Sequence, residues 1–313
     1  MASAGIQVKG LVKKYGDRIA VNGLNLSILE GEIFGLLGPN GAGKSTTISI
    51  LATLLIPNEG EVKICGYDLH RDVKHVKPLI GFVPQELALY PTLSAWDNLT
   101  FFGRIQGMRG PLLRERVASA LALVGLTDRA KDIVNTFSGG MKRRLNIAVG
   151  LIHQPRVLFL DEPTVGVDPQ SRNFIFEHVE RLKTQGMTIL YTTHYMEEVE
   201  RLCDRVAIMD EGHILVLDTP KGLVGLLGGG IIHAVFPPDC VGNLLPSIQR
   251  LPHVREVSPQ DTRLKIETGN SNLALLALID LCNKLNVTIL SLEVLEPNLE
   301  SVFLHLTGKR LRE

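Results

Sequence analysis

The chain has 313 residues, enough for two domains, and 45% of them are hydrophobic. Lysine plus arginine and aspartate plus glutamate both number 33, so the balanced charge gives no general attraction to nucleic acid or to an acidic surface. The 4 cysteines lack the C-x-x-C spacing of zinc sites, and no apolar stretch reaches the roughly 18–20 residues needed to cross a bilayer, so any membrane role would act through a partner.

The first part of the chain predicts a buried strand that leads into a glycine-rich loop. Residues 1 to about 30 predict short strands with turns near Gly16 and Gly23, and the apolar run Ile33–Leu37 predicts a buried parallel strand. The sequence GPNGAGKST follows at once, and a helix is expected from residue 44 to about 55. This order fits the motif G-x-x-x-x-G-K-[ST], whose backbone N–H groups surround phosphates, whose lysine neutralises phosphate oxygens and whose serine hydroxyl is a ligand of Mg²⁺. The loop residues expected to bind a nucleotide are Gly38, Pro39, Asn40, Gly41, Ala42, Gly43, Lys44, Ser45 and Thr46.

The middle of the chain predicts helices around a second phosphate-binding motif. A strand is expected over residues 79–84, and residues from about 86 to 155 predict a mainly helical subdomain. Within it, the sequence SGGM opens a helix with one apolar stripe. Free N–H groups and the helix dipole favour an anion at such a helix start, so Ser138, Gly139 and Gly140 are expected to bind phosphate.

Two acidic residues follow another buried strand. Residues 157–160 (VLFL) are apolar on both faces and end at Asp161 and Glu162. Downstream of a phosphate loop, Asp161 is expected to hold Mg²⁺ directly or through water, and Glu162 to orient or deprotonate the attacking water. A helix from 169 to about 185 and a strand over 188–192 then lead to His194. This alternation of buried strands and helices predicts a largely parallel sheet surrounded by helices.

The composition changes near residue 220, where a second domain is expected to begin. Gly228-Gly229-Gly230 predicts a linker, and the βαββαβ order beyond it predicts a ferredoxin-like fold. A last helix is expected from Pro297, and no catalytic cluster is found in this part. The predicted domains are an ATP-binding domain over residues 1–222, with its helical subdomain at about 86–155, and a regulatory or assembly domain over residues 223–313.

These motifs occur in an order that resembles the ATP-binding cassette (ABC) transporter ATPases. The resemblance covers about residues 5–220 and rests on Gln85, SGGM, DEPTVGVDP and THYMEE. The segment PTVGVDP and the tail EPNLESVFLHLTG are similar to ABC-2 type exporter ATPases, which include the daunorubicin-resistance ATP-binding proteins. The resemblance implies an α/β P-loop NTPase cassette with a RecA-like core, an antiparallel β subdomain and an α-helical signature subdomain. FSGGM stands here where the family usually has LSGGQ, and the serine and both glycines are intact.

The resemblance also implies roles for individual residues. Tyr15 would stack on adenine, and Gln85 would sense Mg²⁺ and the attacking water and touch the membrane subunit. Asp168 would cross a dimer interface, and His194 would contact the γ-phosphate. The SGG segment would close over the γ-phosphate that the opposite cassette holds. The expected catalytic residues are Glu162, His194, Gln85 and Lys44, and the expected ligands of Mg²⁺ are Ser45, Gln85 and Asp161.

The implied function is the ATP-hydrolysing subunit of an ABC transporter, with ATP and Mg²⁺ as its cofactors. It would power export of a drug, a lipid or another amphipathic substrate through a separate integral membrane permease, at the cytoplasmic face of the cell membrane. It would pair with a second cassette, identical or different, and bind no nucleic acid. The alternative is a soluble ABC ATPase that acts on the ribosome or on nucleic acid, and the single cassette, without heptads or C-x-x-C, favours transport. The SGG motif disfavours a P-loop kinase.

Overall fold

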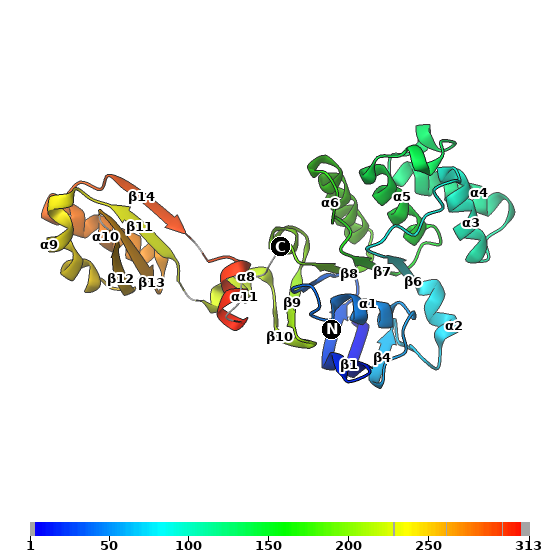
Figure 1. Cartoon of the computed structure of the whole chain (residues 1–313), viewed down its shortest axis with the longest axis horizontal. Helices are drawn as coiled ribbons and strands as arrows, with labels where there is room; N and C mark the ends of the chain where they lie inside the picture. The colour runs from blue at the N-terminus through cyan, green and yellow to red at the C-terminus, as the bar shows by residue number, and fades with distance from the viewer. Residues whose placement is uncertain (1–3, 228, 261, 296, 308–313) are drawn as a thin grey trace. The chain divides into compact units, whose positions relative to one another are not determined.

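The chain consists of two compact units, which are described separately. The computed structural model describes residues 4–227, 229–260, 262–295 and 297–307, and Gly228 of the expected linker lies outside them. The first unit ends at Pro220 and the second begins at Lys221 (Figure 1). Within the described ranges, no helix is both long and apolar enough to cross a membrane.

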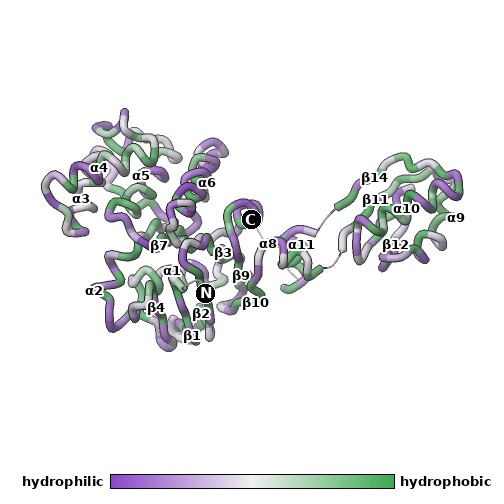
Figure 2. The backbone as a smooth tube through the Cα atoms, turned by 180° about the vertical axis from the view of Figure 1, so that it is seen from behind, coloured by the Kyte–Doolittle hydropathy of each residue, from purple (hydrophilic) through white to green (hydrophobic). Residues whose placement is uncertain are grey.

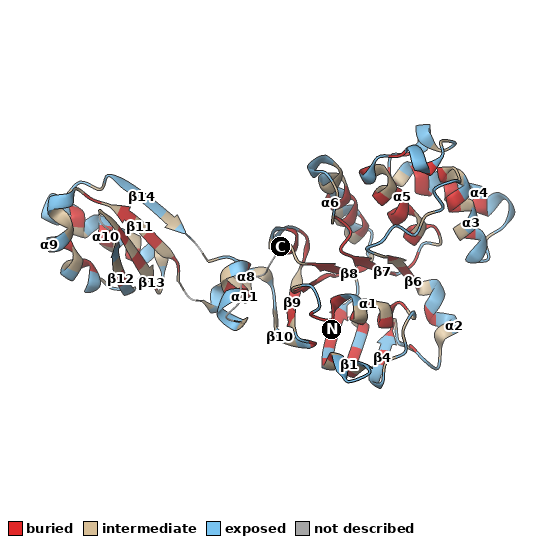
Figure 3. Cartoon of the chain, viewed as in Figure 1, coloured by how far each residue is buried: buried red, intermediate tan, exposed pale blue. Residues whose placement is uncertain are grey.

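A six-stranded sheet forms the centre of the first unit. Its strand order is β10-β9-β3-β8-β7-β6, and all neighbouring strands are parallel except β9 and β10. The apolar runs predicted this arrangement correctly, because strands β3, β7 and β8 are buried along their whole length (Figure 3). The strands are β3 (Ile33–Leu37), β6 (Ile80–Val83), β7 (Val157–Asp161), β8 (Thr188–Thr193), β9 (Arg205–Asp210) and β10 (His213–Asp218).

A second, antiparallel sheet has the order β2-β1-β4-β5. The expected turn at Gly16 is present, but the expected turn at Gly23 is not, because β2 continues through it. Gly23 has a φ of +64° and lies where the pairing of β1 with β2 shifts register, so this glycine makes a bulge instead of a turn. The sequence predicted neither β4 nor β5. The strands are β1 (Ala4–Tyr15), β2 (Arg18–Leu29), β4 (Glu59–Ile64) and β5 (Tyr67–Asp68).

Helices surround the central sheet, and three of them form the helical subdomain. Helices α3, α4 and α5 share a hydrophobic core that includes Leu99, Val117 and Leu145. Helix α1 ends at Leu51, earlier than expected, and Thr53 just beyond it has a φ of +63° that breaks the helix. The helices are α1 (Lys44–Leu51), α2 (Val73–Val76), α3 (Ala95–Ile105), α4 (Gly110–Leu123), α5 (Gly139–Leu151), α6 (Pro169–Thr184) and α7 (Met196–Leu202), with short 3₁₀ turns at Lys77–Leu79, Thr127–Arg129 and Val134–Thr136.

The second unit contains an antiparallel four-stranded sheet of order β12-β13-β11-β14. Together with α9 and α10, this order is the ferredoxin-like arrangement that the sequence predicted. Alternating residues of β11 and β13 are buried, and α10 carries long hydrophobic segments (Figure 2). The elements are α8 (Pro220–Leu226), β11 (Ile231–Val235), α9 (Pro238–Gln249), β12 (Val254–Gln260), β13 (Arg263–Thr268), α10 (Ser271–Leu285), β14 (Ser291–Leu295) and α11 (Leu299–Thr307).

Candidate functional site

The glycine-rich loop joins the end of β3 to the start of α1, and two of its glycines leave no room for a side chain. A Cβ atom on Gly38 would lie 2.2 Å from the carbonyl oxygen of Met209. Gly43 precedes α1 with a φ of +104°, and a Cβ there would lie 2.4 Å from the carbonyl oxygen of Ala20. The backbone therefore takes a path that only glycine permits, with the first N–H groups of α1 unpaired within the helix and available to an anion.

A cavity of about 400 Å³ opens beside this loop. Residues from four distant parts of the sequence line it: the β1–β2 hairpin, the phosphate loop with the start of α1, the loop after β6, and the residue after β7. Tyr15 is 47% exposed and lies at the end of β1, so one face of its ring is open to a ligand. The lining residues are Tyr15, Arg18, Ala20, Asn40, Gly41, Gly43, Lys44, Ser45, Thr46, Gln85 and Glu162.

Beside this cavity, Glu162 connects the phosphate-loop lysine to His194. The Lys44 Nζ atom lies 3.1 Å from Oε1 of Glu162, and His194 Nδ1 lies 3.1 Å from its Oε2. Lys44 and Glu162 are 3% and 4% exposed, so water screens their attraction little. Lys44 also donates to the carbonyl oxygens of Gly38, at 2.7 Å, and Pro39, at 3.1 Å. All the hydrogen-bonding capacity of this ammonium is thus directed at oxygen atoms.

Glu162 itself has an unusual backbone conformation. Its φ is +45°, a region that residues other than glycine seldom occupy. Its N–H group donates to both the carbonyl oxygen and the hydroxyl oxygen of Thr192, each at 3.1 Å. Such strain persists where surrounding bonds hold it, and it accumulates at functional sites. Glu162, which contacts Lys44, thus lies at a strained position directly after β7.

Asp161, one residue earlier, lies beside the serine of the phosphate loop. Ser45 Oγ donates to Asp161 Oδ1 at 3.2 Å, and Thr192 Oγ1 donates to the same oxygen at 2.6 Å. Burial raises the pKa of the Asp161 carboxyl, although these hydrogen bonds and the charge of Lys44 oppose the rise. The described residues contain no cluster of three His, Cys, Asp or Glu side chains able to hold a metal. The hydroxyl and carboxylate oxygens of Ser45 and Asp161 suit Mg²⁺, which takes few protein ligands beside phosphate oxygens and water.

Two side chains of α5, the helix that begins in the SGG motif, form hydrogen bonds with the loop that carries Gln85. Arg143 of α5 donates to the carbonyl oxygens of Pro84, at 3.0 Å, and Gln85, at 2.7 Å. Asn146, one turn further on, accepts from the N–H group of Ala88 at 3.2 Å. The Gln85 side chain is exposed and lines the cavity. Sequence reasoning missed Arg143 and Asn146, because buried polar residues in a helix have no recognisable spacing.

The SGG motif lies beside Asp168 and does not line the cavity. Ser138 caps α5 by accepting from the N–H group of Met141 at 3.2 Å. A Cβ on Gly140 would lie 1.9 Å from Oγ of Ser171, whose N–H donates to Asp168 at 2.9 Å. This hydrogen bond lowers the pKa of the exposed Asp168 carboxyl. Ser138 and the residue after it are exposed and do not line this cavity, so the N–H groups at the start of α5 are open to an anion from outside it.

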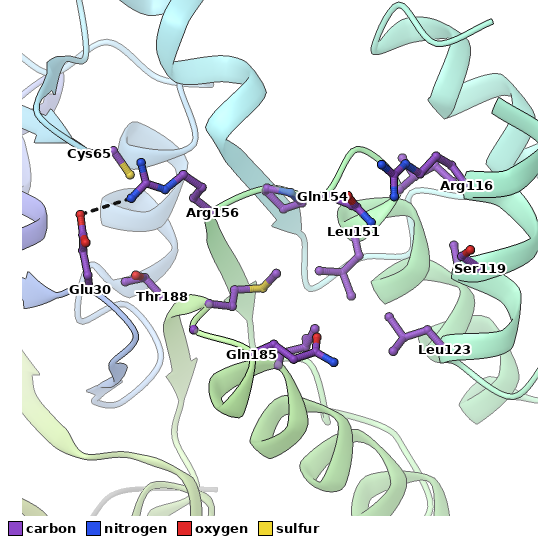
Figure 4. Close-up of a pocket in the computed structure, with 16 residues that line it drawn as sticks. Glu30, Cys65, Arg116, Ser119, Leu123, Leu151, Gln154, Arg156, Gln185 and Thr188 are labelled. Atoms are coloured by element: carbon purple, nitrogen blue, oxygen red, sulfur yellow. Dashed lines mark hydrogen bonds and ion pairs between the residues drawn. The ribbon is translucent and has the colours of Figure 1, made fainter. Parts of the chain in front are cut away.

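A larger cavity, of about 530 Å³, lies at the opposite ends of the same parallel strands. Thr188, the first residue of β8, lines one side of it with Glu30 and Arg156, whose side chains approach to 3.4 Å (Figure 4). Arg116 and Leu123 of α4 line the other side (Figure 4). No residue predicted from the sequence lies on this cavity. Ligands of open α/β sheets bind at the carboxyl ends of the strands, so the smaller cavity is the candidate nucleotide site.

Comparison with known proteins gives relatives over the full length of the chain. A family model described as ABC transporter matches residues 21–165. A linearmycin resistance ATP-binding protein of Bacillus subtilis is 46% identical over 98% of this chain and 100% of its own length. A daunorubicin resistance ATP-binding protein of Streptomyces coeruleorubidus is 36% identical over 100% of this chain and 99% of its own, and a Nod factor export ATP-binding protein I of Paraburkholderia xenovorans is 36% identical over 100% of both.

Solved structures of similar fold cover the first unit of the chain. An ATP binding subunit of an ABC transporter has a TM-score of 0.65 at 28% identity, covering 71% of this chain and 93% of its own. The dimeric structure of MJ0796, a bacterial ABC transporter cassette, has a TM-score of 0.62 at 30% identity, covering 68% and 98% of the two chains.

Proposed function

This chain belongs to the ABC transporter ATP-binding proteins of the exporter type, and we propose that hydrolysis of ATP at the cavity beside Lys44 drives export through a separate integral membrane subunit. The chain is an ATPase. The observation that carries the proposed site is the chain of contacts from Lys44 through Glu162 to His194, with 3.1 Å at each step. It supports a site in which Lys44 binds phosphate, Glu162 is the general base and His194 is a second polar group next to that base.

We propose that ATP frees Glu162 for catalysis because its phosphate groups bind Lys44, the ion-pair partner of Glu162. Phosphate oxygens carry more negative charge than carbonyl oxygens, so they compete for the Lys44 ammonium against Gly38, Pro39 and Glu162. Glu162 then accepts a proton from the attacking water, while its contact with His194 keeps the carboxylate oriented. The N–H groups of the loop and Lys44 neutralise the charge that spreads over the γ-phosphoryl group in the transition state.

Ligands for Mg²⁺ and an aromatic ring that stacks on adenine complete the proposed site. Ser45, Asp161 and Gln85 would hold Mg²⁺, which supplies further charge neutralisation on the phosphate oxygens. The contact between Ser45 and Asp161 supports this assignment, since it already brings two hard oxygen ligands together. Tyr15 would stack on the adenine at the open end of the cavity.

We propose that the working unit contains two cassettes, formed by two copies of this chain. The exposed Ser138 and Gly139 lie away from the cavity of their own chain, which supports a role on the ATP of a partner. Asp168, packed near Gly140, would lie at the same interface. The similarity to a cassette solved as a dimer also supports pairing.

The proposed cargo is a drug, a lipid or another amphipathic compound, in keeping with relatives named for linearmycin resistance, daunorubicin resistance and Nod factor export. The chain would act at the cytoplasmic face of the cell membrane, bound to its permease. Purification of the tagged Glu162→Gln variant from detergent-solubilised membranes with ATP and Mg²⁺, followed by mass spectrometry, tests this. An integral membrane protein should accompany it. Recovery of ribosomal proteins or nucleic acid instead would contradict the proposal.

A further inference from the structure

Glu198 of α7 is a buried carboxylate surrounded by hydroxyl groups. Its Oε1 accepts from Thr164 Oγ1 at 2.6 Å. Its Oε2 accepts from Tyr191 Oη at 2.9 Å and from Thr193 Oγ1 at 2.8 Å. Glu198 is 1% exposed, and its three donors are also buried. In the described part of the chain, no salt bridge reaches this carboxylate.

Such a group is expensive to bury, so its hydrogen bonds must be complete. A carboxylate taken out of water needs donors to replace its hydration, and hydroxyl groups supply them here. The oxygen of Thr193 accepts the N–H group of Tyr195 at 2.9 Å, and its single proton goes to Glu198, since a carboxylate can only accept. A fully satisfied polar network fixes one arrangement of its members more than it adds stability.

The two threonines belong to the segments that carry the proposed catalytic groups. Thr164 follows Glu162 by two residues and lies in the turn toward Asp168, where its carbonyl oxygen accepts from the N–H group of Val167 at 3.2 Å. Thr193 ends β8 and immediately precedes His194. One carboxylate therefore holds both segments, each through one oxygen atom.

We infer that Glu198 is a positioning residue for ATP hydrolysis, which fixes the turn after Glu162 against the segment that carries His194. Its two oxygens set the separation of these segments and so keep Glu162 and His194 at 3.1 Å. The inference rests on the proposed catalytic roles of Glu162 and His194.

Removal of single hydroxyl groups tests the inference with little change in shape. Thr164→Val and Thr193→Val each remove the hydrogen bond that joins one of the two segments to Glu198. Tyr191→Phe is the matched control, since it removes a third hydroxyl that donates to the same carboxylate but belongs neither to the turn after Glu162 nor to the residue next to His194. We expect each threonine variant to lower kcat for ATP at least about tenfold with KM changed less than about twofold, and the phenylalanine variant to keep kcat within about twofold.

A double variant and a second measurement separate positioning from folding. Thr164→Val and Thr193→Val together should lower kcat little further than either alone, because both cut the same link. Thermal unfolding of every variant is measured alongside. If kcat falls equally in all three single variants, or stays normal in the threonine variants, the network only packs the fold and the inference is wrong. Glu162→Gln tests the site separately: its normal hydrolysis would refute the proposed base, whereas its inactivity beside active threonine variants would refute only the role of Glu198.

Discussion

The Lys44 ammonium and the Glu162 carboxylate form a buried ion pair, with Nζ and Oε1 3.1 Å apart. The cation proposed to bind phosphate is thus paired with the acid proposed to activate water. Neither group is exposed enough for water to replace the other as a partner. If ATP takes Lys44 from Glu162, as proposed, binding of the nucleotide and freeing of the base are one exchange of partners.

Glu162→Gln should separate binding from hydrolysis. The amide keeps the shape and one acceptor for Lys44 but cannot take a proton from water, so phosphate release should fall at least about 100-fold. The nucleotide-free variant should unfold at a lower temperature than the parent, because Lys44 loses its counter-charge. ATP should raise its unfolding temperature more than that of the parent, since repulsion between the carboxylate and the phosphates is gone. Normal turnover would show that Glu162 is not the base.

Asp161→Asn should stabilise the nucleotide-free protein at neutral pH while abolishing Mg²⁺-dependent hydrolysis. Burial raises the folded-state pKa of Asp161, so the folded protein binds its proton more readily than the unfolded chain does. The ionised carboxylate therefore costs stability at neutral pH, and this cost disappears as the pH falls through the folded-state pKa. The asparagine variant should melt higher than the parent at about pH 8, and the difference should shrink toward acid.

Asp168→Asn is the control for this pH dependence, because hydrogen bonding to the Ser171 N–H group lowers the pKa of Asp168. Its carboxylate contributes stability above the unfolded-state pKa that is lost as the pH falls, so this variant should not melt higher at neutral pH. An Asp161→Asn variant that melts lower than the parent at every pH would contradict the account.

The two glycines of the SGG motif should respond differently to alanine. At Gly140 a Cβ would lie 1.9 Å from Ser171 Oγ, so α6 must shift and stability should fall by about 1–3 kcal/mol. At Gly139 nothing lies within 4 Å, so alanine should leave the unfolding temperature unchanged or slightly higher. Hydrolysis should nevertheless fall in Gly139→Ala, because in the proposed dimer the phosphate of a second cassette would occupy this open space. Full activity of a stable Gly139→Ala protein would argue against that use of the motif.

Removal of the second unit should spare nucleotide binding. The first unit has its own hydrophobic cores, which include Phe34 and Leu99, and every residue lining the nucleotide cavity lies within it. A protein ending at Pro220 should bind ATP with the affinity of the full chain, measured by fluorescence titration, and should lose co-purification with the membrane subunit. Loss of ATP binding would show that the boundary or the independence of the first unit is wrong.

Local motifs allowed us to predict which of the candidate site residues lie close together. The phosphate loop, Glu162 and His194 each follow a strand of the central sheet, and Asp161 ends one; parallel strands bring such residues to one edge. Lys44, Glu162 and His194 accordingly lie in contact. The order of elements in the second unit likewise predicted its fold, because the helix and strand signals there are local.

Contacts that depend on register could not be predicted. Thr192 meets Asp161 because β7 and β8 pair these two residues, and no short stretch of sequence shows that pairing. A threonine in a buried strand indicates β-propensity, so Thr192 and Thr193 gave no signal of function. Gly23, in contrast, gave a signal with two meanings. The same local sequence fits a turn or a bulge, and only the pairing of β1 with β2 decides between them.

Mixing two inactive variants tests the central claim most directly, namely that each site is built from the Lys44 loop of one copy and the Ser138 motif of another. Ser138→Arg should bind ATP without hydrolysing it, and Lys44→Ala should be inactive through loss of phosphate binding. A mixed dimer of the two keeps one intact composite site, so an equal mixture should recover about a quarter of the parent ATPase activity if copies pair at random and sites act independently. A mixture that stays inactive while each variant still dimerises, or a Ser138→Arg protein that hydrolyses ATP alone, would contradict the account.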